Sequence, residues 1–196
     1  MFSVATNFDD ELPRRLAGLP VTELFGACDG APVGNGRPHA VTPPVSWRAL
    51  DRHVQLARAT GFGFNILLNP LCLDGLENSV HLERKLRRTL RRAKDTGISS
   101  VTVAHPWLVE LAAEAGLRIR VSVFVGICTI EQARYWEELG AHGLALNTHV
   151  VSRDFPTLRR IVMHPPIFPP ISQPTRSPPT PAPASRFWMP LLPIAN

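Results

Sequence analysis

Cysteine is scarce in this sequence, and long hydrophobic runs are absent. The 196 residues hold three cysteines, Cys28, Cys72 and Cys128, an odd number without a CxxC pair. This pattern does not form a disulfide framework and favours free thiols in a reducing compartment. No apolar run approaches the length of a transmembrane helix, and acidic residues at 9–11 come too early for a signal peptide. We therefore expect a cytoplasmic protein that does not enter a membrane.

Several familiar catalytic motifs are also absent. There is no H-E-x-x-H motif, no two of the seven histidines have helical zinc spacing, and there is no G-x-S-x-G nucleophile elbow. The turn after the first predicted strand, residues 7–10, has no glycine and two acidic residues, so it is not the phosphate loop of a dinucleotide-binding fold. These absences count against zinc peptidases, serine hydrolases of the elbow type and dinucleotide-dependent enzymes.

Proline divides the chain into two parts. Nine of the twenty prolines lie in residues 1–163 and eleven in residues 164–196. The second part has no acidic residue and no periodic apolar pattern, so it cannot bury enough surface to fold. We expect a folded domain over residues 1–163 and a disordered, proline-rich tail over residues 164–196.

A strand–helix unit recurs six times in the first part. Strands are predicted at residues 2–6, 21–27, 98–104, 119–125 and 141–146, and within the stretch 62–72, where Pro70 prevents the strand from continuing. The helices between them end at Gly18, Gly61, Gly97, Gly116 and Gly140. The helix starts are predicted from capping residues: Asn7 or Asp9, Ser46, the Thr129/Gln132 capping box, and Ser152 for a last helix to about residue 162. This rhythm requires a parallel sheet with helical crossovers. We prefer a TIM-barrel-like α/β fold, with about six of eight units present, over an open doubly wound sheet.

The positive charge is concentrated in one predicted helix. Residues 81–94 hold seven Arg or Lys against one Glu, a local charge of +6, whereas the whole chain carries +5. Leu82, Leu86, Leu90 and Ala93 form an apolar stripe on this helix, and most arginines fall on the other side. We interpret the basic side as a solvated outer face; the alternative is a surface for phosphate groups, such as those of RNA.

The candidate site residues follow the predicted strands. Functional groups gather at the carboxyl ends of the strands in a parallel barrel. The polar residues at or after these ends are Asn7, Arg37, Asn69, Cys72, Glu77, His105 and Asn147. Cys72 and His105 form a thiol–imidazole pair if the loops bring them together; the alternative for Cys72 is an inert, buried thiol.

A family resemblance extends over the folded part. The segments FSVATNFD (residues 2–9), GxGRP (34–38), FNxLLNxxCL (64–73), VTVxxP (101–106), VSV (121–123) and EELGA (137–141) resemble the peptidase U32 family, also called collagenase-like proteases. The match runs in unbroken order from residue 2 to about residue 162. The resemblance implies a TIM-barrel-like domain and a peptidase of unknown catalytic type.

The resemblance also raises the question of a cofactor. Several relatives act in oxygen-independent hydroxylation of RNA bases or quinone precursors, and hold an iron–sulfur cluster through cysteines further along the chain. Here the proline-rich tail stands in their place, so we expect a C-terminally truncated or frameshifted member. A cluster generally needs four thiolates, and the chain has three cysteines. We therefore expect no cluster, no metal and no other cofactor.

The leading functional hypothesis is a hydrolase acting on peptide substrates, inactive if the missing part is needed. Under it Cys72, His105 and Glu77 are catalytic. Asn7, Arg37, Asn69 and Asn147 bind substrate, and Arg37 meets an anionic group. Two alternatives stay open: an RNA-associated or RNA- or small-molecule-modifying protein, with RNA held by residues 81–94, and a non-functional fragment.

Overall fold

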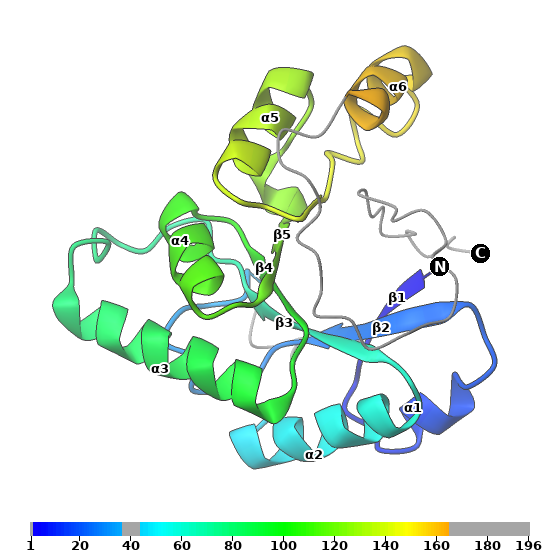
Figure 1. Cartoon of the computed structure of the whole chain (residues 1–196), viewed down its shortest axis with the longest axis vertical. Coiled ribbons are helices and arrows are strands. Elements are labelled where there is room, and N and C mark those ends of the chain that lie inside the picture. Colours follow the sequence, from blue (N-terminus) through cyan, green and yellow to red (C-terminus); the bar gives the residue numbers. More distant parts are fainter. Residues whose placement is uncertain (1, 37–43, 165–196) are drawn as a thin grey trace.

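The strands form one parallel sheet that curls into half of a barrel. The computed structural model describes residues 2–36 and 44–164. The strands are β1 (Phe2–Ala5), β2 (Val21–Gly26), β3 (Gly63–Leu68), β4 (Ser100–Val103), β5 (Arg118–Val121) and β6 (Gly143–Leu144). They pair in the order β1-β2-β3-β4-β5-β6, all parallel (Figure 1). Because each strand pairs with the next along the chain and the order never reverses, the topology is that of a barrel and not of a doubly wound sheet. The predicted fold class is confirmed.

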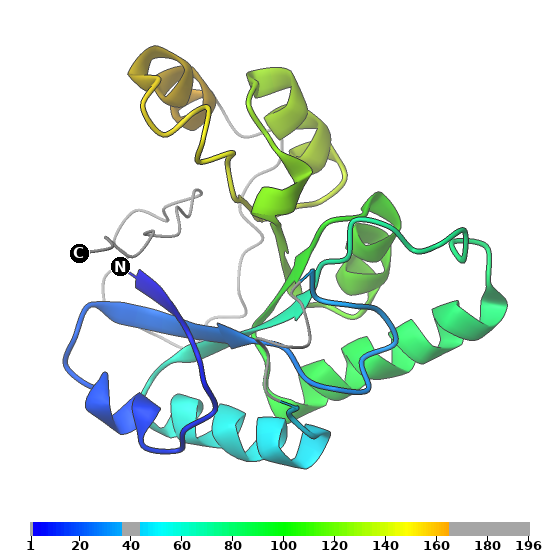
Figure 2. The ribbon, with the colours of Figure 1, turned by 180° about the vertical axis from the view of Figure 1, so that it is seen from behind.

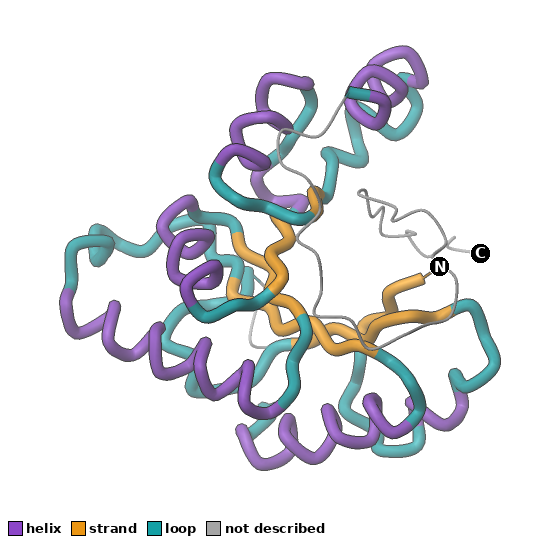
Figure 3. The backbone as a smooth tube through the Cα atoms, in the orientation of Figure 1, coloured by secondary structure: helices purple, strands orange, loops and turns teal. Residues whose placement is uncertain are grey.

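Helices alternate with the strands and cover the convex side of the sheet (Figures 2 and 3). They are α1 (Leu12–Arg15), α2 (Trp47–Ala59), α3 (Val80–Thr96), α4 (Pro106–Glu114), α5 (Ile130–Glu138) and α6 (Phe155–Met163). Ser46 caps α2 by accepting a hydrogen bond from the Ala49 N–H, and Thr129 and Gln132 form the predicted capping box of α5. Among the described residues, no helix combines the length and apolar character needed to cross a membrane.

The hydrophobic core lies between the convex side of the sheet and the helices. The predicted stripe of α3, formed by Leu82, Leu86, Leu90 and Ala93, is buried along its whole length. It belongs to the same cluster as alternate strand residues such as Phe64 and Val101. Since successive strand residues point to opposite faces, the residues between these point to the concave side. The core therefore fixes which side chains line the interior of the half-barrel.

The observed strands are shorter than predicted, most of all at 119–125 and 141–146. The strand predicted at 119–125 ends at Val121, because the Ser122 hydroxyl accepts a hydrogen bond from the Phe124 N–H and caps a 3-10 turn, η2 (Val123–Val125). The turn closes at Gly126, which has a left-handed φ of 74°. The strand predicted at 141–146 is reduced to β6, and an isolated bridge joins Ile127 to Leu146 beyond it.

Two helices also begin at residues other than those predicted. Asp154, and not Ser152, caps α6 by accepting from the Thr157 N–H, while the Ser152 hydroxyl donates to the Thr148 carbonyl. The helix predicted up to Gly18 is a single turn, α1. The side chain of Asn7 accepts from the Asp9 N–H and that of Asp9 from the Glu11 N–H, so both residues shape the preceding turns and neither caps the helix.

The predicted tail lies almost wholly outside the described residues, since only its first residue, His164, is described. The His164 side chain is buried, and its Nε2 atom lies 3.0 Å from Oε2 of Glu137. This contact ties the end of α6 to α5, so the folded part includes His164.

Candidate functional site

Two of the predicted catalytic residues meet at the carboxyl edge of the sheet. Glu77 lies in the loop between β3 and α3, and His105 follows β4, the neighbouring strand. Their side chains approach to 3.7 Å between His105 Nε2 and Glu77 Oε1, and both are partly exposed. The parallel pairing of β3 with β4 is what delivers the two residues to one place, although they are 28 positions apart in the sequence.

His105 is held in one orientation by the start of α4. It is the N-cap residue of that helix, and its Nδ1 atom accepts a hydrogen bond from the Trp107 N–H at 3.3 Å. In the neutral ring the proton then sits on Nε2, which faces Glu77. His105 therefore presents a hydrogen-bond donor at this edge, and the Glu77 carboxylate presents the free acceptor lone pairs.

Cys72 lies in the same loop as Glu77 and is exposed. Its sulfur accepts a hydrogen bond from the Asp74 N–H at 3.2 Å and lies 3.6 Å from the Asp74 carboxylate. Within residues 2–36 and 44–164, no hydrogen bond joins this thiol to the His105 ring, so its partners are local to the loop. The accessible sulfur keeps Cys72 a candidate nucleophile in the loop that also carries Glu77.

The predicted substrate-binding residues are distributed around the same edge. Asn69 is buried at the end of β3, and its Nδ2 donates to the Ser122 hydroxyl at 2.9 Å. Asn7 is exposed, and the Asn147 side chain accepts from the His149 N–H at 3.0 Å after β6. Arg37 lies outside the described residues. The roles of all seven residues stay predictions.

The concave side carries a hydrogen-bonded network that was not predicted. The Glu23 carboxylate on β2 accepts from the hydroxyl of Ser100 at 2.8 Å and from that of Ser3 at 3.1 Å, and it lies 2.6 Å from Nη1 of Arg120. Asn65 extends the network, because its Nδ2 donates to Ser100 at 2.7 Å and its Oδ1 accepts from Thr102 at 2.7 Å. Five strands therefore contribute polar side chains to one connected group.

The ion pair in this network is largely removed from water. The Glu23 side chain is 8% exposed and that of Arg120 is 31% exposed. Burial lowers the pKa of the Arg120 guanidinium from its usual value, and the attraction of the Glu23 carboxylate partly opposes this lowering. The pair is thus stabilised by its mutual attraction and by the two serine hydroxyls against a substantial desolvation cost.

The network lines a hollow of about 340 Å³ inside the half-barrel. The hollow extends from Phe2 on β1 to Phe124 in η2 and includes the side chain of Asn69. Asn69 Oδ1 is buried without a hydrogen-bond partner in the described part of the chain. Gly36 lies against the Phe124 ring and has a left-handed φ of 69°. A Cβ there would lie 2.4 Å from the ring, so a larger residue would strain the backbone and displace the ring. The hollow therefore offers one buried acceptor to a ligand beside the carboxyl edge.

The residues do not fit an iron–sulfur cluster. Cys28 is buried, Cys72 exposed and Cys128 half-buried with its sulfur 3.1 Å from the Gly126 carbonyl oxygen. Across residues 2–36 and 44–164, no three His, Cys, Asp or Glu side chains converge as metal ligands. The absence of a cluster stays a prediction, which iron and sulfide analysis of anaerobically purified protein tests.

Comparison with known proteins agrees with the fold and finds similarity to proteins named as peptidases. No family model matches the sequence. An uncharacterized protease of Methanocaldococcus jannaschii is 26% identical over 141 residues, which are 71% of this chain and 42% of the relative. The solved structure of the U32 peptidase Mk0906 superposes with a TM-score of 0.61 at 24% identity, covering 82% of this chain and 64% of the other. The chain is thus similar in sequence to a protein named protease and similar in fold to a U32 peptidase.

The fold is shared more widely than this relationship. A mutant tryptophan synthase α-subunit from Pyrococcus furiosus superposes with a TM-score of 0.51 at 13% identity, covering 82% of this chain and 71% of that one. The likeness at such low identity concerns the fold alone. The chain spans less than two thirds of the length of both the protease and the U32 peptidase.

Proposed function

We propose that the protein is a hydrolase acting on peptide substrates, with its reaction centre at the carboxyl edge of the half-barrel. The observation that carries the proposal is the approach of His105 to Glu77 at the ends of two adjacent strands, with the exposed Cys72 thiol in the Glu77 loop. The relationship to proteins named protease and U32 peptidase supports the reaction class.

The proposed chemistry divides the proton transfers between the two residues. The Glu77 carboxylate accepts a proton from the attacking group, which is the Cys72 thiol or a water molecule, as that group adds to the scissile carbonyl carbon. The C–N bond then breaks, and the departing amine takes up the proton from Glu77. His105 donates from Nε2 to the carbonyl oxygen, on which negative charge develops. When the thiol attacks, water releases the acyl group from sulfur in a second step.

The concave hollow supplies the proposed binding site for the substrate. A peptide carries N–H donors along its backbone, and Asn69 Oδ1 is a buried acceptor that lacks a partner among the described residues. Binding one peptide N–H there satisfies an acceptor whose desolvation is otherwise uncompensated. Asn7 and Asn147 are proposed to contact the substrate further along the edge, and Arg37, which lies outside the described residues, is proposed to meet an anionic group of the substrate.

The experiment uses three variants that leave the local structure intact. His105→Asn keeps an N-cap residue on α4 but removes Nε2, Glu77→Gln keeps the size but removes the charge, and Cys72→Ser keeps a group that can bond to Asp74. The full-length protein is incubated with a fluorescence-quenched peptide library, and kcat/KM is measured on any peptide that is cleaved. Cys128→Ser is the matched control, since it removes a thiol outside the proposed centre.

We expect His105→Asn and Glu77→Gln each to lower kcat/KM by about 100-fold or more, while Cys128→Ser has no effect. Loss in Cys72→Ser assigns the nucleophile to the thiol, and full activity assigns it to water. The proposal fails if His105→Asn and Glu77→Gln cleave peptides as fast as the unaltered protein, or if no peptide in the library is cleaved.

A further inference from the structure

The seven cations of residues 81–94 do not have equivalent surroundings. Three of them have partners within the protein: Arg87 pairs with Glu83 and Glu114, Arg92 pairs with Asp51, and Lys94 donates to the Gly116 carbonyl. The four cations of this helix that make no ion pair or hydrogen bond within residues 2–36 and 44–164 are Arg84, Lys85, Arg88 and Arg91. Only part of the charge of α3 is therefore used by the fold.

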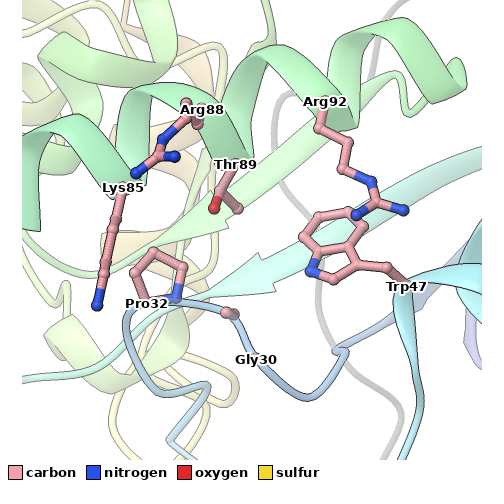
Figure 4. Close-up of a pocket in the computed structure, with 8 residues that line it drawn as sticks. Gly30, Pro32, Trp47, Lys85, Arg88, Thr89 and Arg92 are labelled. Carbon is pink, nitrogen blue, oxygen red and sulfur yellow. The ribbon is translucent and has the colours of Figure 1, made fainter.

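Two of these unpaired cations line a pocket. The pocket has a volume of about 560 Å³ and lies between α3, the start of α2 and the loop after β2. Lys85, Arg88 and Thr89 project from α3 toward the loop that contains Gly30 and Pro32 (Figure 4). Their spacing of three and four residues places them on one side of the helix. The pocket therefore combines two uncompensated cations with a hydroxyl group.

The far end of the pocket is a fixed wall. Trp47 is the first residue of α2, and the Arg92 guanidinium lies over its ring at 4.6 Å from the centroid (Figure 4). The Asp51 carboxylate, 3.0 Å from Arg92, holds the guanidinium in this position. Because Trp47 borders the pocket, so does the amino end of the α2 dipole, which favours a negative charge.

We propose that this pocket binds the phosphate group of a nucleotide, either free or within an RNA strand. Lys85 and Arg88 neutralise the phosphate charge, and Thr89 donates a hydrogen bond to a phosphate oxygen. The volume lies within the range of small-ligand sites, about 300–1,000 Å³, so there is room for more than the phosphate. The pocket shares no residue with the Glu77–His105 pair, and the inference does not depend on the hydrolase proposal.

The test compares two double variants with the same change in charge. Lys85→Ala with Arg88→Ala removes the two unpaired cations that line the pocket. Arg84→Ala with Arg91→Ala removes the two unpaired cations of α3 that do not line it. Binding of ATP and of a single-stranded RNA oligomer is measured by isothermal titration and fluorescence anisotropy on the full-length protein, with pyrophosphate as the competitor. All four side chains are exposed, so the thermal midpoints should stay unchanged and serve as the folding control.

We expect saturable binding that pyrophosphate competes away and that Lys85→Ala with Arg88→Ala weakens about tenfold or more. Arg84→Ala with Arg91→Ala should change it less than about twofold, since only longer-range electrostatics are lost. Binding of ATP, of RNA or of both supports the proposal and identifies the source of the phosphate. Equal weakening by the two double variants would show diffuse attraction to the helix and overturn it, as would failure of both ligands to bind.

Discussion

Replacing Glu23 by glutamine is the sharpest test of the concave network. The carboxylate faces three donors, from Ser3, Ser100 and Arg120. Glutamine has only one acceptor oxygen, and its second group, NH₂, is a hydrogen-bond donor. In the unaltered protein the Arg120 guanidinium lies 2.6 Å from a Glu23 carboxylate oxygen, so in the variant two donors can face each other. The substitution therefore removes a charge and also leaves the Arg120 cation without its counter-ion in a largely buried position.

The expected loss follows from the exposure of the two partners. Removing one member of a fully buried pair costs about 3–5 kcal/mol. The Arg120 side chain is 31% exposed, so water solvates part of the cation, and we expect Glu23→Gln to cost about 2–3 kcal/mol. Arg120→Met should cost about 1–2 kcal/mol, because the two serine hydroxyls still donate to the carboxylate. The double variant leaves no unpaired charge and should lose about 1–2 kcal/mol less than the sum of the single variants.

Urea unfolding of the full-length protein, followed by circular dichroism, gives the four free energies of the cycle. Arg118→Met is the matched control, because Arg118 precedes Arg120 by two residues on β5, is exposed and forms no ion pair in the described part of the chain. It should change the free energy of unfolding by less than about 0.5 kcal/mol. Additive single-variant losses, or a Glu23→Gln variant as stable as the unaltered protein, would refute the idea that the network stabilises the half-barrel.

Three further predictions concern the core and the thiols. Burial lowers the pKa of His53, and the attraction of Asp10 opposes this shift. As the pH falls below about 6.5, the unfolded chain therefore protonates His53 before the folded protein does, and the free energy of unfolding should decrease by up to about 1.4 kcal/mol per pH unit. His53→Gln should flatten this slope in melts between pH 7.5 and 5, and an unchanged slope contradicts the assignment. Burial raises the pKa of the Cys28 thiol to about 11, so iodoacetamide at pH 8 should modify the exposed Cys72 well before Cys28. Peptide mass spectra give the order of modification, and the reverse order would show that Cys28 is accessible. Leu90→Ala on α3 removes a side chain that is 1% exposed and should lower the free energy of unfolding by about 2–5 kcal/mol in urea titrations, which a loss under about 1 kcal/mol would contradict.

The fold could be predicted because its signals are local and repeated. A glycine after each of the first five helices marks the return to a strand, and all five have left-handed φ values, as at Gly97 with 92°. The apolar stripe of α3 identifies its buried face without any knowledge of its partner. The strand–helix unit repeats six times, and a helix that connects two neighbouring strands of one sheet makes those strands parallel. Errors in single boundaries do not change that outcome.

The boundary errors have a common physical cause. Val123 and Val125 favour a strand by their β-branched side chains, but the Ser122 hydroxyl caps a turn there and Gly126 closes it. The same competition decides the start of α6, where either Ser152 or Asp154 can cap a helix. The intrinsic propensity of the residues predicts whether a segment is a helix or a strand. The residue at which that helix or strand begins or ends is decided by the hydrogen bonds that nearby polar side chains form.

The candidate site was predicted only in part, because its chemistry depends on contacts distant in sequence. The residues after the strands were identified by position alone, and the approach of His105 to Glu77 required the register of β3 with β4. The concave network depends on longer separations, since Glu23 and Ser100 are 77 positions apart in the sequence. A signal was nevertheless present, since β4 reads Ser-Val-Thr-Val and β5 reads Arg-Ile-Arg-Val, polar at every second residue.

Such alternation has a definite meaning in a sheet whose other face is buried. A polar side chain on the inner face of a half-barrel costs free energy unless it finds a partner, so the inner polar residues must pair with one another or with a ligand. Glu23, Asn65 and Arg120 pair with neighbours across the strands. Asn69 bonds to Ser122 through Nδ2, but its Oδ1 finds no partner in the described residues. This unsatisfied acceptor lies at the carboxyl end of β3, the strand whose following loop carries Glu77, and we propose that a substrate N–H binds there.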